Sequence, residues 1–286
     1  MARMLTSNER QGRTTVSTSG EIRHHTDGPI ARITIDRAAK HNAMTYAMRD
    51  DLRSLVRAYD RDPAVAVIVL TADGPSFCAG RDIREQVETN RPAFDGSDDD
   101  LTQFGLPPTR KILVTAARGN ALGLGAYLFL AGDIRVASDN LRLAFPEVPT
   151  GVLAPYWLEA TEHLPRAVAF RLAVLGDTAG ARELQVLGMI TETVADDDLE
   201  AVTQHWVERV LLLPPEHART SKDLMDRHRF TLTAAVRARE GDERRRLDAL
   251  DDTREAAAAF VEQRRPRFSG TTATPVETAR PQGGAR

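Results

Sequence analysis

Hydrophobic residues along the chain follow first the two-residue period of strands and then the 3.6-residue period of helices. Residues 29–36 alternate apolar and polar positions, as in a half-exposed strand. Apolar residues then recur at helical spacing from Met44 to Tyr59, and Thr45 is placed to cap that helix. The β-branched run at 64–71 is typical of a strand covered on both faces. This order of strand, helix and strand predicts an α/β fold with right-handed crossovers.

Strand and helix patterns continue to residue 195, and only helical periodicity follows. Further strands are predicted at 112–117, 133–138, 143–148 and 189–194, and helices at 126–131, 164–175, 179–187, 197–213, 216–238 and 242–264. We therefore expect a disordered leader at 1–20, a strand-rich core at 21–196, a helical region at 197–270 and a disordered tail at 271–286.

The stretch from Arg118 to Glu147 carries the clearest chemical signal. Gly119, Gly123 and Gly125 lie where a strand gives way to a helix. The first N–H groups of a helix have no partner within it, so an oxyanion placed there would meet donors. Close packing of the helix on the sheet is the simpler explanation of glycine spacing alone. The stretch matches neither a P-loop nor a dinucleotide fingerprint.

Composition narrows the classes of function. The chain has 286 residues, a formal net charge of −3 and 42% hydrophobic residues, so neither a nucleic-acid nor a membrane partner is expected. Cys78 is the single cysteine, which excludes internal disulfides and suits a reducing compartment, so we expect a cytoplasmic protein. The seven histidines show no metal-ligand spacing, and we predict no metal.

Five stretches of the sequence, in this order, resemble the crotonase family, also called the enoyl-CoA hydratase/isomerase family. Any one of these motifs is weak, but their order and spacing together are specific. They are K-H-N-A-M at 40–44, S-F-C-A-G-R-D-I at 76–83, G-N-A-L-G-L-G-A at 119–126, D-I-R-V-A-S at 133–138 with F-P-E-V at 145–148, and F-V-E-Q-R-R-P-R-F-S-G at 260–270.

The resemblance implies a spiral of ββα turns and a C-terminal helical region at 197–270 used for trimer contacts, often within hexamers. It also implies an acyl-CoA thioester as substrate, with no separate cofactor. The thioester oxygen would be held by the backbone N–H groups of Arg81 and Leu124. Such donors stabilise an enolate, and a positioned base must then move the proton. The resemblance assigns that base to Glu147.

Tyr127 is the main departure from the family pattern. Hydratases of the family place a second glutamate at this position. A neutral phenol with a pKa of about 10 is no base at pH 7, although it can donate a proton or orient water. One carboxylate suffices for double-bond isomerisation, which we favour. Hydration, dehydration or retro-aldol cleavage with help from Tyr127 stays open, as do a CoA-binding scaffold without catalysis and a C–C bond-cleaving hydrolase.

Other candidate residues follow from the resemblance or lie in variable segments. The substrate and CoA contacts that it implies are Lys40, His41, Ala43, Ala79, Asp82, Ile83, Gly123 and Lys222. From the residues themselves, Asp82 and Asp133 favour roles in bracing turns, and Cys78 a buried apolar role. The acyl group would meet the variable segments 85–110, with Phe94, Phe104 and Leu106 as a possible lid, and 152–163, with Tyr156, Trp157, Glu159 and Glu162.

Overall fold

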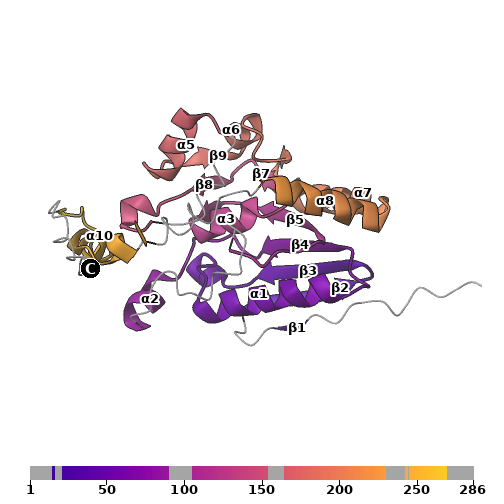
Figure 1. Ribbon diagram of the computed structural model, residues 1–286, viewed down its shortest axis with the longest axis horizontal. Helices are drawn as coiled ribbons and strands as arrows, with labels where there is room; N and C mark the ends of the chain where they lie inside the picture. Colours follow the sequence, from indigo (N-terminus) through magenta and orange to yellow (C-terminus); the bar gives the residue numbers. More distant parts are fainter. Residues whose placement is uncertain are drawn as a thin grey trace, which may run out of the picture.

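The chain forms two β-sheets wrapped by helices (Figure 1). The computed structural model describes residues 15–16, 21–89, 105–153, 164–229, 242–243 and 245–268. The larger sheet has seven strands in the order β1-β2-β3-β4-β5-β7-β10, and the smaller has three in the order β6-β8-β9. The mixed helix and strand content agrees with the predicted α/β class.

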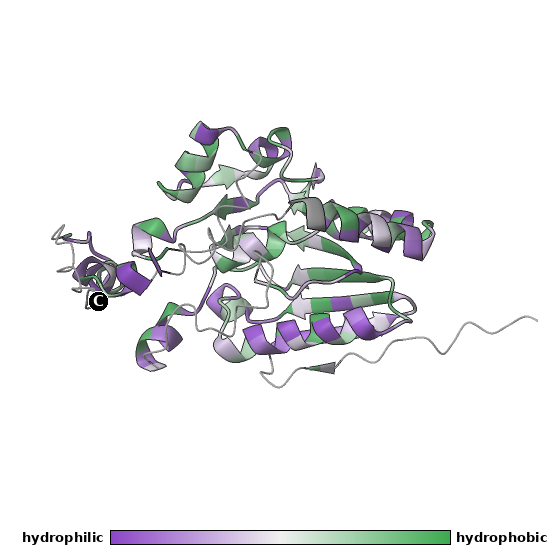
Figure 2. Cartoon of the chain, viewed as in Figure 1, coloured by the Kyte–Doolittle hydropathy of each residue, from purple (hydrophilic) through white to green (hydrophobic). Residues whose placement is uncertain are grey.

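The large sheet is parallel from β3 onward, and its edge is closed by the antiparallel strands β1 and β2. Its strands are rich in buried aliphatic side chains, as expected for parallel strands covered on both faces. Figure 2 shows these strands mainly in the hydrophobic colour, whereas α1 turns a hydrophilic face outward. The strands are β1 (Thr15–Val16), β2 (Ile22–Asp27), β3 (Ile30–Ile35), β4 (Val67–Ala72), β5 (Ile112–Ala117), β7 (Ile134–Ser138) and β10 (Glu192–Val194).

The small sheet forms a second layer of the spiral. It contains β6 (Asn120–Leu122), β8 (Arg142–Ala144) and β9 (Ala179–Gly180). Strand β5 of the large sheet is followed by β6 of the small one, and β7 by β8, so these two turns each supply one strand to each layer. The prediction of a ββα spiral is therefore confirmed.

Helices cover the two layers at positions close to those predicted. Thr45 caps α1 as expected, since its hydroxyl accepts the Met48 N–H at 3.2 Å. All seven residues of α3 are buried, which places it inside the spiral. The helices are α1 (Tyr46–Arg61), α2 (Ile83–Thr89), α3 (Leu124–Leu130), α5 (Arg166–Ala173), α6 (Ala181–Val186), α7 (Leu199–Leu211), α8 (Pro215–Arg229) and α10 (Asp251–Val261), with 3-10 turns η1 (Ala38–Lys40), η3 (Val148–Thr150) and η4 (Asp196–Asp198).

The helices α7 and α10, which follow residue 196, pack on different parts of the molecule. Val207 of α7 packs with Val69 and Val114 on the outer face of the large sheet, so α7 belongs to the folded core. Helix α10 instead packs on η3, the turn that follows Glu147 (Figure 1). The strands end near the predicted boundary at residue 196, but the core extends beyond it.

Several elements differ from the sequence prediction. The strand expected at 143–148 ends at Ala144, because Pro146 lacks an N–H and the chain turns into η3. Strands β2, β6 and β9 were not predicted, and β1 lies within the expected leader. The expected tail, the rest of the leader, Phe94, Phe104, Tyr156, Trp157, Glu159 and Glu162, and the end of the helix predicted at 216–238 lie outside the described residues.

Candidate active site

The register of the second layer brings three distant segments together. Cys78 bridges Ala121, and Ala121 is paired in turn with Leu143 of β8. Each segment then runs on by three or four residues, to Arg81, Leu124 and Glu147. Because these segments are parallel, their ends lie at the same edge of the layer. The three residues that the resemblance assigns to chemistry therefore meet at one place.

Gly80 allows the segment before Arg81 to approach the start of α3. It has φ +104°, and a Cβ on it would lie 3.0 Å from the Leu122 carbonyl oxygen and 3.9 Å from the Leu124 amide nitrogen. The bridge to Met44 uses the Gly80 carbonyl and the Asp82 N–H, at 2.8 Å and 2.9 Å, on either side of Arg81. The Arg81 and Leu124 backbones are thus held close together.

Glu147 is a buried carboxylate that points back at the glycine turn. It is 8% exposed, and its Oε1 would be 3.0 Å from a Cβ on Gly123, which has φ +51°. Only glycine gives the carboxylate that room. The Oε2 atom makes no hydrogen bond of normal geometry to any residue that the structure describes. A buried carboxylate oxygen that lacks such a hydrogen bond is costly to keep ionised and points to a functional group.

Burial makes Glu147 a weak acid for a carboxyl group. Loss of solvent raises its pKa from 4.5 to about 7. Its own backbone N–H, the positive charge of Arg81 and the Tyr127 hydroxyl each lower the pKa, but burial outweighs them. A carboxyl group that is half ionised near pH 7 can both take up and release a proton, as general acid–base catalysis requires.

Tyr127 lies on α3 within the same buried pocket. It is 1% exposed, and its ring packs on Phe145 with centroids 5.1 Å apart. Its hydroxyl acts on the Glu147 carboxyl and lowers the pKa of that group. Tyr127 is therefore a core aromatic and, at the same time, a neighbour of the buried Glu147 carboxyl group.

The segments around Arg81 contain most of the predicted substrate contacts. Lys40 and His41 are exposed on the turn after β3, and the His41 carbonyl accepts the Ala79 N–H at 2.9 Å. Ala43 is half-buried in the same turn, and Ile83 begins α2. These residues flank Arg81, so their placement is compatible with the contacts that the resemblance implies.

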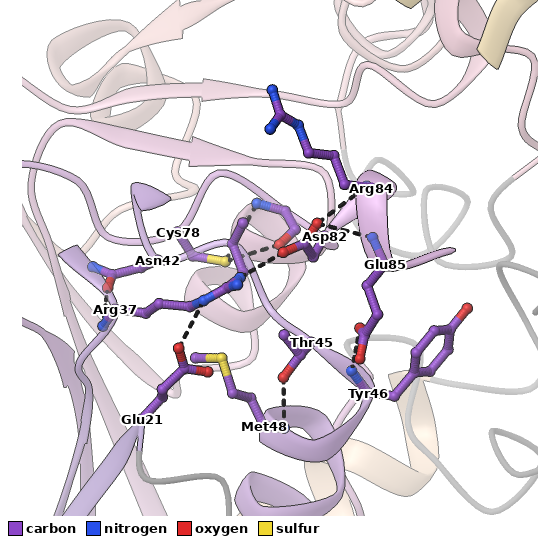
Figure 3. Close-up of polar contacts among 12 residues, drawn as sticks. Glu21, Arg37, Asn42, Thr45, Tyr46, Met48, Cys78, Asp82, Arg84 and Glu85 are labelled. Atoms are coloured by element: carbon purple, nitrogen blue, oxygen red, sulfur yellow. Dashed lines mark hydrogen bonds and ion pairs between the residues drawn. The ribbon is translucent and has the colours of Figure 1, made fainter. Parts of the chain in front are cut away.

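Asp82 has a structural role rather than an open place for substrate. Its Oδ2 accepts the Arg37 guanidinium at 2.7 Å, and its Oδ1 accepts the N–H groups of Arg84 and Glu85 at 3.1 Å and 3.2 Å (Figure 3). Both oxygens are thus engaged in capping α2 and bracing the turn. These contacts support the structural role that its residue type favoured, and the substrate contact that the resemblance implies stays a prediction.

Cys78 behaves as a buried apolar residue, as expected. It is fully buried, and burial raises the pKa of the thiol to about 12, so the reactive thiolate is absent at neutral pH.

Lys222 lies at the other end of the large sheet. Its ammonium contacts Asp133 Oδ2 at 2.5 Å and the Lys111 carbonyl at 3.1 Å, and the same Asp133 oxygen accepts the Leu113 N–H at 2.8 Å. These residues mark the amino ends of β5 and β7, whereas the glycine turns follow the carboxyl ends of β4 and β5. Within one chain, Lys222 therefore neutralises Asp133 and does not reach Glu147, and the structure gives no support to its predicted contact with CoA.

Arg37 braces the segments around Arg81, and the sequence did not predict this role. Its guanidinium pairs with Glu21 at 2.8 Å and with Asp82, and it donates to the Ala43 carbonyl at 2.8 Å (Figure 3). Its position just after a strand was the one available signal, because its partners are 16 residues before and 45 residues after it in sequence.

Two further observations concern the described part of the chain. No cluster of three or more His, Cys, Asp or Glu side chains suitable for a metal ion occurs in it. Nor does any helix there combine the length and apolarity of a bilayer span.

Comparisons with known proteins agree with the geometry. The family model for enoyl-CoA hydratase/isomerase matches residues 25–271. A probable enoyl-CoA hydratase of Mycobacterium leprae is 31% identical over 84% of this chain and 94% of its own length. The 1,2-epoxyphenylacetyl-CoA isomerase of Escherichia coli is 27% identical over 87% of this chain and 98% of its own.

Solved structures share the fold. An enoyl-CoA hydratase/isomerase from Pseudoalteromonas atlantica superimposes with a TM-score of 0.76 and 25% identity, over 87% of this chain and all of the other. The carnitinyl-CoA hydratase of Mycobacterium avium gives 0.75 and 25%, over 92% of this chain and all of the other. The crotonase-type fold, the matched family model and the convergence of Arg81, Leu124 and Glu147 lead to one conclusion: the chain belongs to the enoyl-CoA hydratase/isomerase family, whose members act on acyl-CoA thioesters.

Proposed function

We propose that this enzyme moves a double bond within the acyl chain of an enoyl-CoA, with Glu147 as the acid and base. The observation that carries the proposal is the buried carboxyl group of Glu147, which has a pKa of about 7 and, among the residues that the structure describes, is faced by Tyr127 where hydration would call for a second carboxylate. Backbone N–H groups of Arg81 and Leu124 would hold the thioester oxygen.

The reaction is written for a double bond between the third and fourth carbons of the acyl chain. The Glu147 carboxylate removes a proton from the second carbon, and the electron pair of that C–H bond moves toward the thioester oxygen. The resulting dienolate carries its negative charge on that oxygen, between the two N–H donors. Protonated Glu147 then delivers the proton to the fourth carbon, and the double bond ends between the second and third carbons. No water or second base is consumed.

Burial of Glu147 supports both halves of this cycle. An exposed carboxyl group, with a pKa near 4.5, would be a weaker base and would remove the proton from the second carbon reluctantly. With its pKa raised to about 7, the group exchanges the proton with little loss of free energy in either direction. Packing of Tyr127 and Phe145 beside it also limits water, which would otherwise compete for the dienolate.

Hydration of the double bond is the second candidate. It is favoured by the interaction of the Tyr127 hydroxyl with the Glu147 carboxyl, since a phenol at this place could orient a water molecule. Several relatives carry the name hydratase, among them the 2,3-dehydroadipyl-CoA hydratase of Escherichia coli, 26% identical to this chain. Dehydration uses the same groups in reverse.

Proton exchange tests the shared core of both candidates. Wild type and Glu147→Gln are incubated in heavy water with saturated and unsaturated acyl-CoAs, and deuterium uptake and products are followed by mass spectrometry. We expect the wild type to exchange the proton next to the thioester and the variant to lose that exchange. Equal exchange by both proteins would remove Glu147 as base, and no exchange of any bound thioester would support the scaffold reading instead.

Products from the unsaturated substrates separate the two candidates. A product of the same composition as the substrate, heavier only by deuterium that includes a new carbon position, indicates isomerisation. A gain of one water molecule indicates hydration.

We also propose that the chain works as a homotrimer or as a hexamer of two trimers in the cytoplasm. Large apolar side chains are exposed on α8 and α10 and directly after α7, including Met225, Phe260 and Leu212, and burying them between copies would remove apolar surface from water. Light scattering after size-exclusion chromatography tests the assembly, and a monomeric mass at micromolar concentration would contradict it.

A further inference from the structure

Two segments that flank the proposed oxyanion hole are joined along their backbones. The first is the turn 37–44, which contains Lys40 and His41, and the second is the segment 78–82. Three backbone hydrogen bonds connect them, from Met44 N–H to the Gly80 carbonyl at 2.8 Å, from Asp82 N–H to the Met44 carbonyl at 2.9 Å, and from Ala79 N–H to the His41 carbonyl at 2.9 Å. Arg81 lies within the second segment, so its backbone position depends on the first.

Arg37 fastens this pair of segments with its side chain and its backbone. Its Nη1 donates to the Ala43 carbonyl at 2.8 Å and to Asp82 Oδ2 at 2.7 Å, and so spans both segments. Its backbone N–H donates to Asn42 Oδ1 at 2.7 Å, which closes the turn. Its Nε pairs with Glu21 before β2, at 2.8 Å (Figure 3). One guanidinium therefore ties the first segment, the second segment and the edge of the sheet.

The ion pair of Arg37 and Asp82 is shielded from water. The Arg37 side chain is 17% exposed and that of Asp82 is 15% exposed. Burial alone would raise the pKa of Asp82, but the hydrogen bond and charge of Arg37 and the N–H groups of Glu85 and Arg84 outweigh it, and the pKa is lowered. Asp82 is thus ionised at neutral pH, and both partners carry their full charge across the contact.

We propose that Arg37 is a positioning residue for catalysis: through Asp82 and Ala43 it holds the backbone N–H of Arg81 in place to receive the thioester oxygen. The inference rests on the proposed function, because it gives Arg37 a role in the same oxyanion hole. Asp82 is the residue directly after Arg81, so the anchored carboxylate restrains the peptide on one side while the Gly80 carbonyl, bonded to Met44, restrains it on the other. Arg37 itself touches neither substrate nor the reacting atoms.

Small displacements of such a donor have large effects on rate. Removing one donor from an oxyanion hole lowers kcat by about 100- to 1000-fold, and a shift of about 1 Å can cost about 100-fold. Loss of the Arg37 contact would misplace the Arg81 N–H without deleting it. We therefore expect kcat to fall by about 10- to 100-fold, with a smaller change in KM.

The test reads the oxyanion hole directly, in the full-length protein. A saturated acyl-CoA with a ¹³C-labelled thioester carbonyl is bound to wild type, Arg37→Met, Arg37→Lys and Asp82→Asn, and the carbonyl stretch is measured by isotope-edited infrared difference spectroscopy. Two aimed N–H donors should lower the stretching frequency in the wild type. We expect Arg37→Met and Asp82→Asn to lose most of that lowering and Arg37→Lys to restore part of it.

Asp82→Asn keeps the proposal falsifiable if Arg37→Met does not fold. Asparagine retains an oxygen that can accept the Arg84 and Glu85 N–H groups, so the start of α2 is preserved. The variant that combines Arg37→Met with Asp82→Asn should show the same loss of kcat and of carbonyl shift as either single variant, because the two side chains act through one contact.

Arg219→Met is the matched control. Arg219 has a side chain that is 18% exposed, pairs with Glu216 at 2.9 Å and donates to the Val65 carbonyl at 3.0 Å, but it lies at the amino end of β4. The Arg219→Met variant should be less thermally stable than the wild type, with an unchanged carbonyl stretch and an unchanged kcat.

Two outcomes would overturn different claims. If the wild type lowers the carbonyl frequency and the Arg37 and Asp82 variants lower it equally, the positioning role is wrong and the ion pair serves stability alone. If the wild type leaves the frequency of a bound thioester unchanged, the oxyanion hole and with it the proposed function fail.

Discussion

Asp82 and Glu147 are two carboxylates near the ends of second-layer segments, and their surroundings give them opposite properties. Asp82 is held by Arg37 and by two N–H groups at the start of α2, and its pKa is lowered. Glu147 is buried, its Oε2 has no hydrogen bond of normal geometry within the described residues, and its pKa is raised to about 7. The same functional group is thus a fixed brace in one place and a proton carrier in the other. Burial and hydrogen-bonding partners, rather than the carboxyl group itself, decide which of the two roles each residue takes.

The largest expected difference between the two carboxylates is in proton transfer. Glu147→Gln should lower the rate of α-proton exchange by about 1000-fold, within the range typical of losing a general base. Asp82→Asn should still exchange the α-proton, because Glu147 is intact, but at a reduced rate, because the Arg81 N–H is less well positioned. Quench-flow sampling of deuterium uptake measures both, with Glu216→Gln on the exposed start of α8 as a control that should match the wild type. Similar exchange rates in Glu147→Gln and Asp82→Asn would contradict the assignment of different roles to the two carboxylates.

Stability should respond to the two substitutions with opposite signs. The pKa of Glu147 is higher in the folded chain than its ordinary value of 4.5, so the folded state loses stability as pH rises from 4.5 to about 7. Above pH 7 the cost reaches about 3 kcal/mol, since each pKa unit corresponds to about 1.4 kcal/mol. Glu147→Gln removes that charge and should raise the free energy of unfolding at pH 8 but not at pH 4.

Asp82 should show the reverse dependence. Its pKa is lowered from 3.8, so its stabilising contribution is present above that pH and is lost as pH falls below it. Asp82→Asn should lower the free energy of unfolding at pH 8 by about 1–3 kcal/mol, as for loss of a hydrogen bond between charged groups. Urea titrations of both variants across the pH range check these signs. A destabilised Glu147→Gln at pH 8 would mean that its carboxylate is satisfied in the folded chain.

The pH dependence of turnover should report the Glu147 carboxyl group. Because the reaction begins with the ionised form, kcat/KM should rise with pH, pass its midpoint at about 7 and level off above it. Below the midpoint it should fall about tenfold for each pH unit. Initial rates between pH 5 and pH 9 measure the profile, and a flat profile over that range would contradict the assignment.

The smallest expected effect is that of the Tyr127 hydroxyl. That hydroxyl lowers the pKa of Glu147, so Tyr127→Phe should move the midpoint of the pH profile to higher pH. Loss of one hydrogen-bonding partner should also lower the rate at pH 7 by about fivefold. Tyr59→Phe is the control, since the Tyr59 hydroxyl bonds His24 at 2.8 Å on α1 and β2, away from Glu147. If both variants behave alike, Tyr127 serves packing alone.

The sequence predicted those strands and helices that a short residue pattern marks by itself. The alternating run at 29–36 and the β-branched run at 64–71 became β3 and β4, and Thr45 caps α1 as expected. Strand β2 was missed because its residues, I-R-H-H-T-D, do not alternate. It is a strand because all six of its residues pair with β3, and that pairing is not written in its own composition.

The candidate site was predicted unevenly for the same reason. Gly80, Gly123 and Glu147 leave a signal in the sequence because close approach and a buried acid require those residue types at fixed places in a motif. Arg37 leaves only its position just after a strand, and an arginine there is ordinary until its partners are known. Lys222 was placed by motif alone, and Asp133 holds it at the other end of the sheet.

The sequence by itself determined the α/β class and the glycine turns, because periodicity and backbone freedom are properties of short segments. Its resemblance to the family, carried by motifs in a fixed order, identified the carboxylate expected to move a proton. Only the tertiary structure decided that Glu147 is buried with a pKa of about 7 and that Asp82 is neutralised by Arg37. Those properties depend on solvent exclusion and on charges from distant parts of the chain, and the register of parallel strands is what brings those parts together.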